Sequence, residues 1–381
     1  MSTTTTTLPS RMKAQYLDAF NTPYVLRETE LPTITSSDDL LIKVTAASYC
    51  HTDNVLALGE MQPLPYKFPH IGCHEYAGTV TQLPPEPSTH AANFRIGDEV
   101  GVPGRAFHPC GTCYECRLEP SESDPDADDA GYSVYCPNSG NNGLSHPGGF
   151  REFAIVDARQ VALLPAGMDA VNAAPLMCAG ITIFAALKNC RLKEGQRVGI
   201  AGCGGGLGHL GLQFAVKMGY KVTGIDAGDK PMELAKGLGL DVQLIDSRYE
   251  SASSIVEKIG AEDGKTDQRE KGLDAVIVLP ESQKAFDYSI ELLKTHGKCI
   301  LVSFPKTGFH LSAHDVVFRD ISIRGSLVGT TRVLKEMLQF AAKHNIKAII
   351  RRYRLEDLNF LVEDYLKGIG GKLVIEMVKA S

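Results

Sequence analysis

The fold is decided by residues 198–208, whose sequence is VGIAGCGGGLG. An apolar run that ends in clustered glycines, followed by apolar residues at helical spacing up to Met218, predicts a strand, a tight loop and a helix. The next apolar run, VTGID at 222–226, predicts a second strand. In such a unit the glycines let the backbone approach a pyrophosphate at the start of the helix. Residues 198–226 therefore predict a βαβ unit that binds a dinucleotide.

The register of the glycine loop stays open on sequence alone. One choice of glycines, at 202, 205 and 208, is spaced one residue wider than the usual fingerprint. Another, at 206, 208 and 211, matches the fingerprint but begins too late after the strand. We expect the cofactor contacts of this loop to come from Gly202, Gly205, Gly206, Leu207 and Gly208.

Asp226 ends the second strand, about 20 residues beyond the loop. A carboxylate at this position accepts hydrogen bonds from a ribose hydroxyl and repels a 2′-phosphate, so NAD is expected rather than NADP. The alternative interpretation of Asp226 is a solvated turn residue.

Further apolar runs continue the same pattern. Strands are expected at 242–245, 275–279 and 298–303, with helices around 230–238 and 282–294 between them, and this alternation predicts a doubly wound parallel sheet. Residues from about 11 to 165 are rich in turns and short strands, which predicts a mainly β domain. We therefore expect an α/β protein with a first domain at 1–177, a nucleotide-binding domain at 178–326 and a return to the first domain at 327–381.

The composition limits the classes of binding partner and the expected cellular location. The 381 residues carry a formal net charge of -6, which disfavours nucleic acid and anionic membranes and favours a small-molecule partner. Neither a signal peptide nor a transit sequence is evident in the polar start Met1–Thr7, so the cytoplasm is the expected location. The ten cysteines then indicate reduced thiols and metal ligands rather than disulfides.

Three separated residues, Cys50, His74 and Cys178, predict a catalytic zinc site. Two cysteines and one histidine leave the fourth zinc position for water or a substrate oxygen. Each residue alone has an ordinary explanation, since buried cysteines are commonly small core residues. The interpretation as a metal site depends on their joint occurrence with the other motifs.

A second cluster predicts a closed, structural zinc site. The cluster consists of Cys110, Cys113, Cys116 and Cys136. Four thiolates complete the coordination of one zinc ion and leave no open position. The 19-residue spacer before the last cysteine is acidic and is expected to be a solvated surface loop, with carboxylates at Glu119, Glu122, Asp124, Asp126, Asp128 and Asp129. A zinc finger that binds DNA is the alternative, but it would need a basic face.

Together these motifs resemble the zinc-dependent alcohol dehydrogenases of the medium-chain dehydrogenase/reductase superfamily, over nearly the whole chain. The resemblance rests on motifs in the family's order, namely Cys50-His51-Thr52-Asp53, His74-Glu75-Tyr76-Ala77-Gly78, the four-cysteine lobe at about 105–140, Cys178-Ala179-Gly180-Ile181-Thr182 and Gly205-Gly206-Leu207-Gly208. It implies a Rossmann domain, a GroES-like catalytic domain, two Zn²⁺ per subunit, NAD, and a homodimer or homotetramer.

The resemblance also implies a role for individual residues. Asp53 would orient the zinc ligand His74, Glu75 would be an auxiliary carboxylate near the metal, and Thr52 would relay the substrate proton. Hydride would pass between a zinc-bound alkoxide and the nicotinamide. The expected cofactor contacts outside the loop are His51 at the pyrophosphate, Asp226 and Lys230 at the adenosine ribose, Ser303 near the nicotinamide and Lys372 at the phosphates.

Some positions depart from the family's small-alcohol pattern. Val55 replaces a histidine that often ends the proton relay, and Met61 and Gly104 stand where aromatic residues narrow an ethanol pocket. The resemblance therefore implies a wider pocket, suited to longer, branched or aromatic alcohols.

Three alternatives stay open. The first is a dehydrogenase or carbonyl reductase for polyols or aromatic alcohols of specialised metabolism. The second is a zinc-free quinone or enoyl reductase, which would not need the three catalytic ligands together. The third is a non-catalytic structural protein that binds NAD and zinc, because a fold alone does not fix function.

Overall fold

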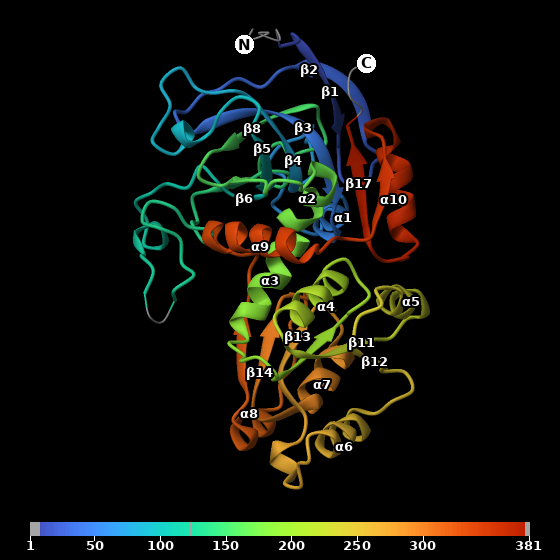
Figure 1. The fold of residues 1–381 in the computed structure, drawn as a ribbon. Helices are drawn as coiled ribbons and strands as arrows, with labels where there is room; N and C mark the ends of the chain where they lie inside the picture. Colours follow the sequence, from blue (N-terminus) through green and yellow to red (C-terminus); the bar gives the residue numbers. More distant parts are fainter. Residues whose placement is uncertain (1–7, 122–123, 378–381) are drawn as a thin grey trace.

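The computed structural model describes residues 8–121 and 124–377, so the polar start Met1–Thr7 and Glu122 lie outside the described residues. The chain forms two bodies, each built around its own large sheet (Figure 1). Helices α3 (Ala179–Asn189) and α9 (Thr331–His344) lie where the two bodies meet (Figure 1).

The lower body is a six-stranded parallel sheet with the order β12-β11-β10-β13-β14-β15. The strand order reverses between β10 and β13, which is the switch point where doubly wound sheets bind ligands. The strands are β10 (Arg197–Ala201), β11 (Lys221–Asp226), β12 (Gln243–Asp246), β13 (Leu273–Val278), β14 (Leu293–Leu301) and β15 (Ser322–Gly325). The helices are α4 (Gly208–Lys217), α5 (Asp229–Gly237), α6 (Ala252–Glu262), α7 (Gln283–Leu292) and α8 (Ala313–Arg319). The predicted doubly wound Rossmann sheet is confirmed.

The upper body is mainly β, as predicted. Its large sheet has the order β16-β17-β3-β4-β5-β9, and β8 also pairs with β3. These strands are β3 (Asp39–Tyr49), β4 (Glu75–Gln82), β5 (Glu99–Pro103), β8 (Phe153–Asp157), β9 (Ala162–Leu163), β16 (Ile350–Tyr353) and β17 (Lys372–Glu376). Two small sheets join β1 (Arg11–Tyr16) to β2 (Val25–Glu30) and β6 (Arg105–Phe107) to β7 (Gly140–Asn141). The end of the chain thus returns to the first sheet through β16 and β17.

Short helical segments complete the upper body. They are α1 (His51–Ala57), α2 (Ala170–Ala173), α10 (Leu358–Leu366) and the 3₁₀ turns η1 (Ala91–Asn93), η2 (Glu115–Arg117), η3 (Ala174–Met177) and η5 (Leu355–Asp357); the turn η4 (Gln268–Glu270) belongs to the lower body. No single helix in the described part of the chain is long and apolar enough to cross a membrane. The bent pair Ala170–Met177 and Ala179–Asn189 passes that test by length and composition, and its apolar residues are packed inside the protein.

The two bodies share one apolar core at α3. Phe184 of α3 is fully buried and packs edge-on against Phe214 of α4, with ring centroids 5.2 Å apart. Leu338 of α9 belongs to the same buried cluster. Burial of such side chains contributes roughly 2 kcal/mol each, so the junction of the bodies is a packed interior.

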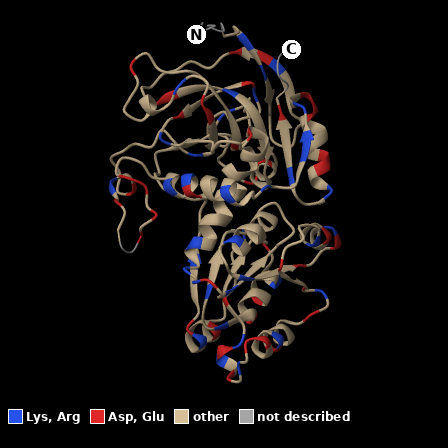
Figure 2. Cartoon of the chain, in the orientation of Figure 1, with Lys and Arg blue, Asp and Glu red and all other residues tan. Residues whose placement is uncertain are grey.

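The acidic spacer departs only in part from the solvated loop that the sequence predicts: residues 117–121, 124–125 and 129–130 are exposed, whereas residues 126–128 are partly or fully buried. Its part at 126–129 lies against α3 and the start of α9: Lys188 donates to Asp126 Oδ1 at 2.7 Å, and the backbone N–H groups of Thr331 and Arg332 donate to Asp128 Oδ1 at 2.8 and 3.3 Å. Asp128 is only 8% exposed. Figure 2 shows acidic residues on this loop and basic residues on α9. Carboxylates are favourable at a helix N-terminus, which explains why this segment docks there.

Candidate metal centres and cofactor site

Three different elements bring the open-site ligands together. Cys50 follows β3 and precedes α1, His74 precedes β4, and Cys178 stands between η3 and α3, where the chain bends by 52°. One ligand atom from each of the three residues lies within 4.8 Å of the others. The structure therefore gathers the predicted set into one cluster at the junction of the two bodies.

The orientation of His74 fits a metal ligand. Its Nδ1 lies 3.1 Å from Asp53 Oδ1, so its Nε2 faces the cluster, 3.3 Å from Cys178 Sγ. For tetrahedral zinc with ordinary bond lengths, a nitrogen and a sulfur ligand lie about 3.5 Å apart. The donor set and its spacing fit zinc.

Asp53 contacts His74 on the side of the ring away from the other ligands. The carboxylate is fully buried, and it accepts hydrogen bonds from the backbone N–H of Cys50 at 2.9 Å and of Cys73 at 3.2 Å, besides its contact with His74. A carboxylate behind a ligating imidazole fixes its tautomer. The structure thus places Asp53 where the predicted orienting role requires it.

The surroundings of Cys50 favour its thiolate. Hydrogen bonding from Cys178 lowers the pKa of Cys50 well below its ordinary value, and the charge of His74 adds to the shift. Zinc binds thiolates, so this shift favours the form of Cys50 that would hold the metal.

Glu75 and Lys372 form a buried ion pair beside the cluster. The Lys372 ammonium bonds to Glu75 Oε1 and donates to the Tyr49 carbonyl at 3.0 Å, while Glu75 also accepts from Ser48 Oγ at 2.8 Å. Burial raises the pKa of Glu75, and the charge of Lys372 opposes that rise and favours the carboxylate. Glu75 thus holds the Lys372 ammonium, while the aliphatic part of Lys372 lies next to Gly206 of the glycine loop, and the contact of Lys372 with cofactor phosphates stays a prediction.

Thr52 and His51 lie at the edge of the cluster on α1. The Thr52 hydroxyl is 3.8 Å from Cys50 Sγ. The exposed His51 ring bonds through Nδ1 to the Tyr365 hydroxyl at 2.8 Å, and its Nε2 is 4.0 Å from Glu281. His51 thus stands between α10 and the loop after β13, and its contact with a pyrophosphate stays a prediction.

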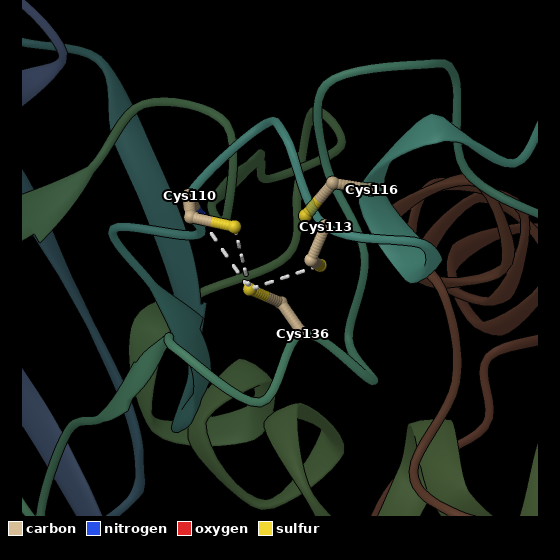
Figure 3. Close-up of side chains that lie close together, drawn as sticks. All are labelled: Cys110, Cys113, Cys116 and Cys136. Carbon is tan, nitrogen blue, oxygen red and sulfur yellow. Dashed lines mark hydrogen bonds between the residues drawn. The ribbon is translucent and has the colours of Figure 1, made fainter.

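The second cluster has the geometry of a closed zinc site. Figure 3 shows its four cysteine side chains converging on one point. Cys136 Sγ lies 3.7 Å from Cys110 Sγ and 3.8 Å from Cys113 Sγ. Tetrahedral zinc with Zn–S bonds of 2.3 Å separates its sulfurs by about 3.8 Å. These distances fit four-cysteine coordination.

The glycine loop turns tightly between β10 and α4. Gly202 has φ of 81°, and a Cβ on Gly208 would lie 2.1 Å from the Gly202 carbonyl oxygen. A Cβ on Gly204 would lie 2.0 Å from the Pro231 oxygen, whereas one on Gly205 would meet nothing closer than 3.4 Å. Gly205 and the following Gly206 therefore form the open side of the loop, and Leu207 leads directly into α4.

Asp226 ties this loop to the end of β11. Its Oδ2 accepts from the Gly204 N–H at 3.0 Å and its Oδ1 from the Ala227 N–H at 2.8 Å. It is thus a structured, half-buried residue at the carboxyl edge of the sheet. Two other predicted cofactor residues have protein partners: Lys230 Nζ donates to the Lys367 carbonyl at 3.4 Å, and Ser303 Oγ to the Pro280 carbonyl at 2.9 Å.

The sequence interpretation missed Gly204, Tyr365 and Glu281. The sequence could have indicated Gly204, because it belongs to the same glycine cluster. Only the structure shows why no side chain fits there, since a Cβ would meet the backbone of Pro231. Tyr365 and Glu281 reach His51 from positions 314 and 230 residues away in the chain. No local pattern marks contacts of that kind.

Comparison with known proteins agrees with this geometry. The family described as "Alcohol dehydrogenase GroES-like domain" matches residues 36–166, and "Zinc-binding dehydrogenase" matches 206–343. The chain is 34% identical to an alcohol dehydrogenase of Geobacillus stearothermophilus, covering 96% of this chain and all of the relative, and 32% identical to one of Moraxella sp., covering 96% and 99%.

A solved structure shows the same similarity in three dimensions. The alcohol dehydrogenase of the archaeon Aeropyrum pernix has a TM-score of 0.80 at 27% identity, over 96% of this chain and 99% of that one. With both zinc clusters assembled on this fold, the chain belongs to the zinc-dependent alcohol dehydrogenases of the medium-chain dehydrogenase/reductase superfamily.

Proposed function

We propose that this protein is an NAD-dependent dehydrogenase that interconverts alcohols wider than ethanol with their aldehydes or ketones. The observation that carries the proposal is the three-ligand cluster of Cys50, His74 and Cys178 beside the Thr52 hydroxyl. A zinc ion held there would act as a Lewis acid on an alcohol or carbonyl oxygen. A purely structural zinc protein would not need a three-ligand site with an open position.

The residues of the chain supply the remaining parts of the chemistry. Thr52 can hold the substrate proton at Oγ1, as a relay and not as a strong base. Asp53 keeps His74 oriented, and the buried pair of Glu75 and Lys372 lies behind the ligands. Val55 offers no proton acceptor, whereas the His51 ring of α1 is exposed to solvent.

The proposal of a wider substrate is supported by Gly104, which has no side chain at a position where an aromatic residue would narrow the pocket. A Cβ built on this residue would lie 2.5 Å from the Cβ of His74, so the present backbone admits no side chain there. An aromatic ring at position 104 is therefore excluded unless the backbone moves. Met61, at another such position, is flexible and adapts to irregular ligands. Both features support longer, branched or aromatic alcohols as substrates.

The preference for NAD rests on Asp226. Its carboxylate stands at the end of β11, fixed by the loop that would face the cofactor. A 2′-phosphate near this carboxylate would meet like charge.

The test is steady-state kinetics with linear, branched and benzylic alcohols, each with NAD and with NADP. The proposal predicts a higher kcat/KM for benzylic or branched alcohols than for ethanol, and for NAD than for NADP. A clear preference for ethanol or for NADP would contradict the corresponding part, and absence of alcohol oxidation would favour a carbonyl or enoyl reductase.

We also propose that the chain acts as a homo-oligomer. Strand β15 ends the parallel sheet, and next to it α8 exposes Val317 and Phe318 to 71% and 74%. An exposed sheet edge beside apolar side chains favours pairing with another chain. Light scattering after size exclusion should give a mass of at least two chains, and replacing Phe318 with Glu should lower it; a monomeric wild type would contradict this.

A further inference from the structure

His209 lies directly behind the glycine loop, in the first turn of α4, and is completely buried. Its Nδ1 is 2.9 Å from the Gly205 carbonyl oxygen, and its Nε2 is 3.1 Å from the backbone nitrogen of Ile349. A carbonyl only accepts and an amide N–H only donates, so the two contacts together require the neutral imidazole with its proton on Nδ1. Burial lowers the pKa of His209 to about 4, which agrees with a neutral ring at neutral pH.

The first contact sets the direction of a peptide group on the open side of the loop. In a planar trans peptide, the C=O and the N–H point in opposite directions. The Gly205 carbonyl is held towards the helix by both the backbone N–H of His209, at 3.1 Å, and the ring. The N–H of Gly206 in the same peptide is therefore turned out of the helix start, towards the place where a pyrophosphate would bind.

The second contact ties this loop to the sheet of the other body. Ile349 stands immediately before β16, and its carbonyl accepts from the Lys372 N–H at 2.8 Å. One turn further along α4, Gln213 donates to the Lys347 carbonyl at 2.9 Å and accepts from the Lys347 N–H at 3.3 Å. Both side chains thus attach α4 to residues 347–349, but only His209 also holds the loop.

We propose that His209 is a positioning residue for the cofactor: it fixes the Gly205–Gly206 peptide to receive the dinucleotide pyrophosphate and fastens that peptide to the sheet beside which Cys50 and His74 stand. This inference rests on the proposed function, because it presumes that the loop binds NAD(H). It predicts an effect of His209 on cofactor affinity rather than on the chemical step.

The test compares three substitutions of His209 in the full-length, zinc-loaded protein. His209→Leu loses both contacts. His209→Asn can keep a donor at the place of Nδ1 and so keeps the contact with Gly205, whereas His209→Gln can keep an acceptor at the place of Nε2 and so keeps the contact with Ile349. Gln213→Leu is the matched control, since it loses contacts with the same segment without touching the loop.

Two readouts separate positioning from general stability: NADH affinity by fluorescence titration, and hydrogen exchange of the backbone around Ile349. The Leu and Gln variants should bind NADH about tenfold more weakly, the effect expected for one lost buried hydrogen bond. The Asn variant and the Gln213→Leu control should stay within about threefold of the wild type. Protection at Ile349 should persist in the Gln variant and fall in the Leu and Asn variants, and kcat at saturating NAD should change little.

NADH affinity of His209→Leu equal to that of the wild type would overturn the inference. An equal loss of NADH affinity in all four variants, in proportion to their loss of melting temperature, would also overturn it. That result would mean that the substitutions weaken binding only by destabilising the fold. If the wild type itself bound no NADH, the proposed function would fall and the inference with it. If the wild type binds NADH and the His209 variants bind it equally well, the inference falls but the proposed function stands.

Discussion

At the scale of single residues, Asp53 decides the geometry of the open zinc site. One buried carboxylate accepts from two backbone N–H groups and meets the ring of His74. An amide in its place has one oxygen and would turn its NH₂ group towards at least one of these donors. The site therefore depends on a residue that is not itself a ligand.

We expect Asp53→Asn to weaken zinc binding at this site by about 10- to 100-fold, the usual effect of losing a partner behind a ligating histidine. Against a competing chelator, elemental analysis should show the open site emptying while the four-cysteine site keeps its metal. Loss of both zinc ions at the same chelator concentration would instead mean that the variant unfolds, and unchanged zinc affinity would contradict the assigned role.

Asp128 makes a prediction about pH. Burial raises its pKa from an ordinary 3.8 to about 6, and its Oδ2 has no hydrogen-bond partner. The folded protein then holds this proton more tightly than the unfolded chain. The stabilisation is complete below about pH 3.8 and is lost as the pH rises through about 6. One pKa unit corresponds to about 1.4 kcal/mol, so the contribution is of order 1–3 kcal/mol.

Replacing Asp128 with Asn keeps an acceptor for the start of α9 but removes the titration. Urea unfolding from pH 5 to 8 should show a smaller decrease in stability with rising pH than in the wild type. Asp129→Asn is the matched control, since that side chain is 89% exposed and pairs with Arg332. Parallel pH profiles for the wild type and Asp128→Asn would contradict the prediction.

At the scale of elements, the loop between β10 and α4 separates two kinds of glycine. Gly204 is needed by the fold, because a Cβ there would meet the backbone of Pro231, which cannot turn away as a side chain can. A Cβ on Gly205 would lie no closer than 3.4 Å to another protein atom, so a requirement for glycine at this position would come from the ligand.

Two alanine variants test this distinction. Gly204→Ala should destabilise the protein by about 2 kcal/mol or more, because the loop must move, and should impair cofactor binding as well. Gly205→Ala should keep the melting temperature of the wild type but weaken NADH binding. Calorimetry and fluorescence titration of the two proteins would check this, and equal destabilisation of both would count against the assignment.

The same loop shows how far the sequence can predict structure. Residues 198–226 predict strand, turn and helix correctly because those contacts are local and the apolar spacing is regular. The zinc ligands were recognisable because each stands in a motif. The ion pair of Glu75 with Lys372, 297 residues apart, and the docking of Asp126–Asp129 on α9 depend on tertiary contacts, which no local pattern encodes.

At the scale of the whole molecule, two zinc clusters serve opposite needs. The closed cluster would hold together a lobe whose described residues form a small buried apolar group, Ala106, Tyr132 and Val134, and this lobe reaches α9 through the acidic spacer. The open cluster lies where the two bodies meet, with Cys178 at the start of the helix they share. A zinc ion bound at the open cluster could therefore be lost without removing one bound in the lobe.

Because the two clusters are separate, one measurement can decide whether the open cluster holds a catalytic zinc. Zinc content and NADH formation from NAD with benzyl alcohol would be measured for the wild type, for Cys50→Ala and for Cys190→Ala, a buried cysteine outside both clusters. We predict that Cys50→Ala keeps the zinc of the four-cysteine site and its fold, but loses the other zinc and about a thousandfold or more in rate, while Cys190→Ala keeps both. Alcohol oxidation by Cys50→Ala at the wild-type rate, with the open-site zinc absent, would contradict the account.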